Sequence, residues 1–166
     1  MIVVLMGVSG SGKTTIGKLL AQRAGALFAD ADDYHPQANK EKMAAGHPLD
    51  DADRKPWLVA LNGVLRGWYA SGANGVLACS ALKESYRVTL ADEMPHGAVT
   101  FCLLQVSAEV LQARLAERTH EFMNPKLLES QLATLELPKD ALVVQNDREP
   151  TVVADQIFKL ISGEKV

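Results

Sequence analysis

The sequence has 166 residues, a length that fits one domain with a full hydrophobic core, so we expect a single domain over residues 1–166. Apolar residues make up 48% and charged residues 22%, which is the composition of a globular protein rather than of a disordered one. The net charge of −3 argues against a nucleic acid or an anionic membrane held by bulk charge. Any bound anion must therefore occupy a local site.

The first residues and the cysteines indicate a cytoplasmic protein. The apolar run Met1–Met6 is short and carries no preceding basic segment, so we expect a strand rather than a signal peptide or a membrane anchor. Cys79 and Cys102 both lie in apolar runs without metal-ligand spacing. They are interpreted as buried, reduced thiols.

Strand-like and helix-like stretches alternate along the chain. The expected strands are residues 1–6, 26–29, 75–79, 99–106 and 141–145. The expected helices are residues 14–25, a long helix after residue 53, and then 83–93, 107–118, 126–136 and 152–161. The polar stretch 34–53 is expected to hold short helices, and the two tryptophans of the long helix belong to its apolar, core-facing stripe. Apolar strands that alternate with helices predict an α/β fold with a five-stranded parallel sheet covered on both faces.

A glycine-rich motif follows the first predicted strand and opens the first predicted helix. Residues 7–14 match G-x-x-x-x-G-K-[ST], the phosphate-binding loop (P-loop) of nucleoside triphosphate hydrolases and kinases. Its glycines let backbone N–H groups approach phosphate oxygens, Lys13 reaches the β- and γ-phosphates, and Thr14 can bind Mg²⁺. The predicted nucleotide-binding residues are Gly7, Val8, Ser9, Gly10, Ser11, Gly12, Lys13, Thr14 and Thr15.

The position of the carboxylates favours a kinase of small molecules over other P-loop classes. The D-x-x-G and N/T-K-x-D patterns of GTPases do not occur in the sequence, and the third strand ends in Cys79-Ser80-Ala81 rather than in an acidic residue. Acidic residues instead follow the second strand, as Asp30, Asp32 and Asp33. A carboxylate there can orient an acceptor hydroxyl or take its proton. A solvated acidic turn is the alternative interpretation.

Several further blocks, in this order along the chain, resemble the gluconokinase family. They are DADDYHP from residue 30, NKEKM from 39, GHPL from 46, DADRKPWL from 51, CSALK from 79 with Tyr86-Arg87, and later His120, Phe122, Met123, Leu127, Leu128, Ser130, Gln131, Leu135 and Glu136. The resemblance implies ATP- and Mg²⁺-dependent phosphorylation of the 6-hydroxyl of D-gluconate, and a fold related to the shikimate and nucleoside monophosphate kinases. It also implies a homodimer and a small mobile lid at about residues 118–126.

Within this resemblance, Asp32 is expected to face the acceptor hydroxyl and Asp30 to support Mg²⁺ or Lys13, although the reverse assignment is open. His35 and His47 could hydrogen-bond substrate hydroxyls, but each precedes a proline and could equally shape a turn.

Basic residues are candidates for the substrate carboxylate. Arg54 can hold a carboxylate bidentately, while Lys83 and Arg87 are spaced i,i+4, which would place two cations on one helix face. The alternative for this pair is an exposed basic face or pairing with acidic neighbours such as Glu84.

Arg114 and Arg118 are also spaced i,i+4, beside the expected lid, where they would contact adenine or neutralise phosphate charge. A solvated helix face is the alternative. Residues 146–148 follow the last strand, at the place of an adenine-contacting loop in related kinases.

The sequence therefore predicts a cytoplasmic gluconokinase, with Lys13, Asp32 and Arg118 as catalytic residues. The alternatives are a kinase of the same fold that acts on another small polyol or hydroxy acid such as shikimate, and a non-catalytic ATP-binding regulator. The preference for ATP over GTP is not specified by the residues.

Overall fold

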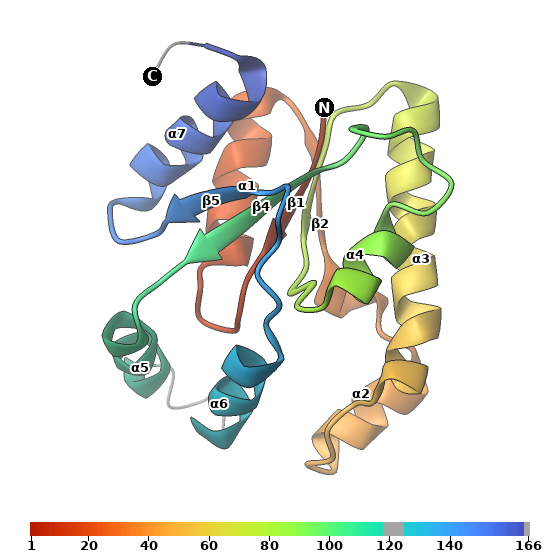
Figure 1. The fold of residues 1–166 in the computed structure, drawn as a ribbon, viewed down its shortest axis with the longest axis vertical. Helices are drawn as coiled ribbons and strands as arrows, with labels where there is room; N and C mark the ends of the chain where they lie inside the picture. Colours follow the sequence, from red (N-terminus) through yellow and green to blue (C-terminus); the bar gives the residue numbers. More distant parts are fainter. Residues whose placement is uncertain (118–124, 165–166) are drawn as a thin grey trace.

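A computed structural model describes residues 1–117 and 125–164, which form a five-stranded parallel sheet in the order β2-β3-β1-β4-β5 (Figure 1). The strands are β1 (Ile2–Met6), β2 (Leu27–Asp30), β3 (Gly75–Ala78), β4 (Thr100–Gln105) and β5 (Leu142–Gln145). The helices are α1 (Lys13–Ala24), the 3₁₀ helix η1 (Ala31–Tyr34), α2 (Gln37–Ala44), α3 (Asp51–Ser71), α4 (Glu84–Leu90), α5 (Ala108–Glu117), α6 (Pro125–Thr134) and α7 (Pro150–Ser162). The predicted α/β class and the predicted sheet are confirmed.

The central strand β1 shows why the sheet is buried on both faces. Because side chains alternate along a strand, Val4 and Met6 point to one face and Val3 and Leu5 to the other. The first face packs against α3 and α4, and the second against α1 and α7 (Figure 1). This is the layering that uniformly apolar strands predict.

The helix α3 begins earlier than its apolar stripe indicates. Asp50 and Asp53 form a reciprocal cap, since the Asp50 carboxylate accepts from Asp53 N at 2.7 Å and the Asp53 carboxylate accepts from Asp50 N at 2.9 Å. Pro56 lies inside the helix, past its first turn, so it lacks the N–H that would donate to the carbonyl of residue 52. The early start places Asp51 and Arg54 on the same rigid helix as the core residue Trp57.

The carboxyl ends of the parallel strands gather at one edge of the sheet, and α5 and α6 lie at the same end of the molecule (Figure 1). In such sheets ligands bind at this edge. Among the described residues no helix has the length and apolarity needed to cross a membrane.

Candidate active site

The phosphate-binding loop joins β1 to α1, and backbone hydrogen bonds hold its shape. Gly7 N donates to the carbonyl of Ser80 at 3.2 Å, which ties the loop to the chain after β3. The Lys13 ammonium donates to the carbonyls of Gly7 and Val8 at 2.9 and 3.0 Å, so it lies over the loop. The predicted loop between a strand and a helix is confirmed in its geometry.

Gly12 is a loop residue at which a side chain would not fit. Its φ is +93°, and a Cβ atom there would lie 2.4 Å from Asn146 Nδ2. As the residue that precedes α1, Gly12 also offers no side chain to the N–H groups of the first helical turn. These groups and the positive end of the helix dipole are therefore open to an anion.

A hollow of about 250 Å³ lies beside the loop. Arg114 lines it and donates to the carbonyls of Gly10 and Asn146, both at 3.1 Å, which joins α5 to the loop and to the segment after β5. The Asn146 side chain is buried and donates to Ser11 O at 2.7 Å, yet its Oδ1 atom has no hydrogen-bond partner within the described residues. A buried orphan acceptor beside an open hollow fits a ligand that carries N–H donors. The lining residues are Gly10, Gly12, Thr15, Ile16, Arg114, Glu117, Asn146 and Pro150.

Asp30 connects the loop to the acidic cluster after β2. Its carboxylate accepts a hydrogen bond from the Thr14 hydroxyl at 2.7 Å and another from Asp32 N at 3.0 Å. A hydroxyl and a carboxylate in contact at the phosphate end of the loop are oxygen ligands of the kind Mg²⁺ prefers, and Mg²⁺ in kinase sites needs few of them. The residues present therefore fit the predicted ion.

Asp32 lies next to this pair; its side chain as a whole is exposed to solvent, although protein atoms crowd its carboxyl group. Burial of its carboxyl group by surrounding protein atoms, followed by the negative charge of Asp30, raises its pKa above the ordinary aspartate value of 3.8, while Lys13 opposes the shift. The raised pKa brings this carboxylate closer to the range in which it can accept a proton reversibly.

His35 lies beside Asp32 and forms the wall toward the core. Its ring stacks on Trp57 with 4.4 Å between centroids, and Trp57 Nε1 donates to Ala31 O at 2.7 Å. Burial, aided by the charges of Arg54 and Lys40 and opposed by Asp32, lowers the pKa of His35 below 6.5. At neutral pH the imidazole is therefore uncharged, with both a donor and an acceptor nitrogen.

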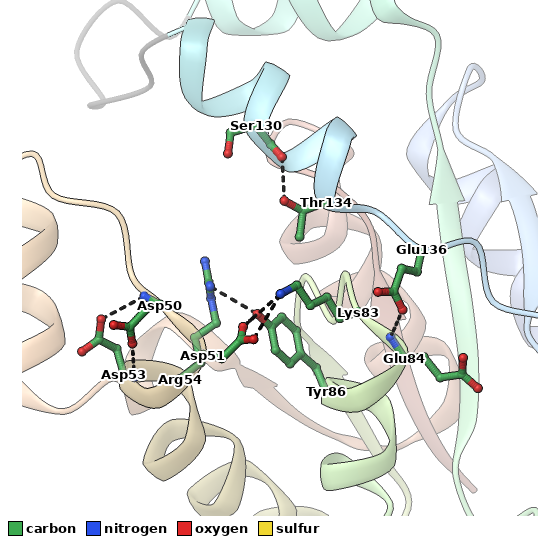
Figure 2. A network of polar contacts seen from close by, with 10 residues as sticks. All are labelled: Asp50, Asp51, Asp53, Arg54, Lys83, Glu84, Tyr86, Ser130, Thr134 and Glu136. Atoms are coloured by element: carbon green, nitrogen blue, oxygen red, sulfur yellow. Dashed lines mark hydrogen bonds and ion pairs between the residues drawn. The ribbon is translucent and has the colours of Figure 1, made fainter.

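Arg54, Lys83 and Tyr86 form a polar cluster with Asp51 on the other side of the site (Figure 2). Tyr86 donates to Asp51 at 2.5 Å, and Lys83 Nζ lies 3.1 and 3.2 Å from the two Asp51 oxygens. Arg54 Nη1 lies 3.2 Å from the Tyr86 hydroxyl. The Tyr86 and Lys83 hydrogen bonds lower the pKa of Asp51, so this carboxylate is ionised at neutral pH. Two cations and one exposed anion therefore share this surface.

Arg87 lies apart from this cluster, so the structure does not place Lys83 and Arg87 together on one face. Lys83 precedes α4 as its cap residue, whereas Arg87 is only 7% exposed and donates to the carbonyls of Ala81 and Leu82 at 2.9 and 3.2 Å. Its guanidinium holds the turn after β3, where Ala81 adopts a φ of +44°. His47 is exposed and its backbone closes the turn after α2, which agrees with its turn-shaping alternative.

The structure brings to the site several residues for which the sequence predicts no role. Gln131 contacts the phosphate-binding loop, Glu136 contacts the start of α4, and Asp51 and Tyr86 organise the polar cluster. In the sequence, the resemblance to the family marks all four residues: Asp51 opens the block DADRKPWL, and the other three are isolated matches. Arg118 and most of the expected lid, residues 118–124, lie outside the described residues.

The comparisons with known proteins agree with this geometry. Residues 2–138 match the family model described as "AAA domain", and this match, the fold and the loop together define a P-loop nucleotide-binding protein. The chain is 44% identical to a gluconokinase of Gluconobacter oxydans, over 98% of this chain and 92% of that protein. The chain belongs to the gluconokinase family.

Two solved structures extend this similarity to three dimensions. A gluconokinase from Sinorhizobium meliloti superposes with a TM-score of 0.82 at 36% identity, covering 99% of this chain and 97% of that one. An unliganded sugar kinase from Janibacter superposes with a TM-score of 0.86 at 40% identity, covering 96% and 93% of the two chains. The similarity thus spans both the phosphate-binding loop and the polar cluster.

Proposed function

We propose that the protein transfers the γ-phosphoryl group of ATP to the 6-hydroxyl of D-gluconate, with Mg²⁺ as the metal ion. The observation that carries this proposal is the place of Asp32: its backbone N–H donates to the Asp30 carboxylate, which also accepts from Thr14 of the loop, and its side chain lies near both Lys13 and His35. A carboxylate at this junction can meet an acceptor hydroxyl and a γ-phosphate at the same time. Family membership supports the choice of gluconate.

The phosphate side supplies positioning and positive charge. The first-turn N–H groups of α1 bind the phosphates, and Lys13 moves from the loop carbonyls to the phosphate oxygens. Thr14 and Asp30 would hold Mg²⁺, which would neutralise phosphate charge. Arg114 and the hollow around Asn146 take the adenosine part. Arg118, outside the described residues, adds positive charge near the transferred group.

The acceptor side orients the sugar acid. Arg54 and Lys83 bind the gluconate carboxylate, in competition with Asp51, and Arg87 supports them by holding the turn before α4. The neutral His35 imidazole exchanges hydrogen bonds with hydroxyls along the chain of the substrate. This arrangement directs the 6-hydroxyl toward Asp32.

At Asp32 the ionised carboxylate accepts the proton of the 6-hydroxyl as the new O–P bond forms. The bond between the γ-phosphorus and the β–γ bridging oxygen breaks in line, and ADP leaves with that electron pair. The protein performs no covalent chemistry of its own, so most of the acceleration comes from position and charge.

A coupled ADP-release assay tests the proposal. Purified protein with ATP and Mg²⁺ is offered gluconate, shikimate, glycerate and free sugars in parallel. Turnover that depends on gluconate is the expected result, and nuclear magnetic resonance of the product should show phosphate on carbon 6. Turnover with another acceptor would indicate a kinase of different specificity. ATP binding without turnover on any acceptor would indicate a regulator.

We further propose that residues 1–166 act as one kinase domain with its lid at about residues 118–126, and that two copies form a cytoplasmic homodimer. The buried, unpaired thiols of Cys79 and Cys102 support a reducing compartment. Light scattering at working concentration should give twice the 17.9 kDa chain mass.

A further inference from the structure

The helix α6 contacts both halves of the active site, although it contributes none of the residues assigned above. Leu128, on its inner face, is 6% exposed and belongs to a small apolar cluster with Val8 of the phosphate-binding loop, Leu82 of the turn after β3, and Leu111 of α5. Leu135, just beyond the helix, packs against this cluster and also against the main core beneath α3 and α4. These contacts fix α6 against two segments that are far apart in the sequence.

Gln131 adds a directed contact to the phosphate side. Its Oε1 atom accepts a hydrogen bond from Ser9 N at 2.7 Å, across 122 positions of sequence. Ser9 precedes the first-turn N–H groups of α1, which remain open for phosphate. The Ser9 amide thus serves as an attachment point of the loop, and a partly buried N–H finds its acceptor there.

Glu136, in the segment that directly follows α6, adds a contact to the acceptor side. Its backbone N donates to Leu82 O at 2.8 Å, and its carboxylate accepts from Glu84 N, also at 2.8 Å (Figure 2). Lys83 gives no side-chain cap to α4, so Glu136 supplies the missing acceptor at the positive end of that helix. Lys83, which precedes this helix, and Tyr86, which lies within it, both belong to the polar cluster of the acceptor side.

We propose that Gln131 and Glu136 are positioning residues, which together form a brace that sets the separation between the phosphate-binding loop and the acceptor-binding residues. This inference rests on the proposed function, because the separation matters only if a phosphoryl group crosses between the two sides. Neither residue touches the reacting atoms. The brace acts on the alignment of donor and acceptor, to which transfer rates are steeply sensitive.

The first test is Gln131→Met, which keeps the side-chain volume and removes the acceptor. The kcat should fall roughly tenfold or more, since small misplacements of reacting groups have effects of this size. The KM values for ATP and gluconate should each change by less than about threefold, because the binding groups themselves remain. Gln145→Met is the control: it makes the same side-chain change but removes an exposed hydrogen bond outside the site, which Gln145 donates to Gln105 at 2.7 Å, and it should leave kcat unchanged.

Gln131→Glu separates the hydrogen bond from mere packing. It retains an acceptor oxygen for Ser9 N, so most of kcat should return, while the added negative charge near the phosphates should raise the KM for ATP. Glu136→Ala should lower kcat through the other end of the brace. The double variant Gln131→Met with Glu136→Ala should lose little more kcat than the less active of the two single variants, because both changes disable the same brace.

Hydrogen–deuterium exchange gives a readout that does not depend on turnover. In the nucleotide-free protein, Gln131→Met should speed exchange in peptides that cover residues 7–12, while Gln131→Glu and Gln145→Met should not. If the wild type fails to phosphorylate gluconate, the proposed function fails while these exchange data still decide whether Gln131 holds the loop. Unchanged exchange in Gln131→Met, a kcat within twofold of wild type, or strictly additive losses in the double variant would each overturn the brace.

Discussion

The phosphate side and the acceptor side of the active site differ in the groups that form them, backbone groups on the first and side chains on the second. The phosphate side consists largely of backbone groups, with the glycine turn at Gly12 and a buried polar contact between Asn146 and Ser11. The acceptor side consists of long charged side chains, and the side chains of Lys83 and Asp51 are 31% and 65% exposed. The first is fixed by the fold, and the second by the rotamers of individual residues.

This difference indicates which side of the site tolerates substitution and which side determines the choice of acceptor. A backbone cradle tolerates few substitutions, because every change in its path moves several N–H groups together. A cluster of side chains can be altered one residue at a time, so a change of acceptor within this fold is expected on α3 and α4. Asp32 stands at the boundary and belongs functionally to both sides.

Substitution at that boundary should have the largest effect. Asp32→Asn keeps the size of the side chain but removes the proton acceptor, so kcat should fall by about 10²–10⁴-fold. ATP binding, measured by calorimetry, should persist because the loop is untouched. Wild-type turnover in this variant would remove Asp32 from its proposed role.

The pH dependence of the same residue gives a second measurement. Because burial and Asp30 raise the pKa of Asp32 in the folded protein, kcat/KM should decline on the acid side at a pH above the ordinary aspartate value of 3.8. The raised pKa also means that the stabilising contribution of this group is present below pH 3.8 and is lost as the pH rises through the folded value. Asp32→Asn should therefore be at least as stable as the wild type at neutral pH, although it is nearly inactive.

The next largest effect should come from Gly12→Ala, on the phosphate side. The positive φ and the collision with Asn146 should lower the free energy of unfolding by about 1–3 kcal/mol and weaken ATP binding. Gly63→Ala on α3 is the control, since a Cβ there meets no atom within 4 Å. That variant should gain roughly 0.5–1 kcal/mol of stability from helix propensity and keep its ATP affinity. Equal behaviour of the two variants in urea titrations would contradict the rigid cradle.

Arg87→Met tests whether Arg87 stabilises the fold or binds the substrate directly. Removal of a buried guanidinium that bonds two carbonyls should lower the free energy of unfolding by about 1.5–3 kcal/mol. Lys83→Met, on the exposed side of the same turn, should leave stability nearly unchanged and act on the KM for gluconate instead. The opposite pattern would restore Arg87 as a direct ligand of the substrate.

Arg54→Ala should have the smallest of these effects and the most selective one. Loss of one charged contact to the substrate carboxylate should raise the KM for gluconate about tenfold, which corresponds to roughly 1.4 kcal/mol of binding free energy. The KM for ATP should stay the same in the same coupled assay. A parallel rise in both constants would indicate that Arg54 supports the fold around Tyr86 rather than the substrate.

The fold and the phosphate side could be predicted from the sequence because their signals are local. Apolar strands and the motif over residues 7–14 specify the sheet and the loop without reference to distant residues. The observed elements differ from the predicted ones mainly at their ends, as for α3, whose start depends on the cap between Asp50 and Asp53.

The acceptor side was harder to predict because its contacts join distant segments. The i,i+4 spacing of Lys83 and Arg87 predicts a common face only if both residues lie within the helix, and Lys83 instead precedes it. No local pattern shows that Gln131 reaches Ser9 or that Lys83 reaches Asp51. The family-like blocks mark such residues, but their contacts, and hence their roles, follow only from the folded structure.

The stacking of His35 on Trp57 gives this protein an internal optical probe. Of the two tryptophans in the chain, Trp57 lies under the acceptor side, and Trp68 packs far from it against Gly75. We expect the emission of Trp57 to follow the protonation of His35, because a charged imidazolium and a neutral imidazole act differently on the stacked indole. Ligands that displace the His35 ring alter the same signal, so acceptor binding becomes visible without a label and apart from ATP binding.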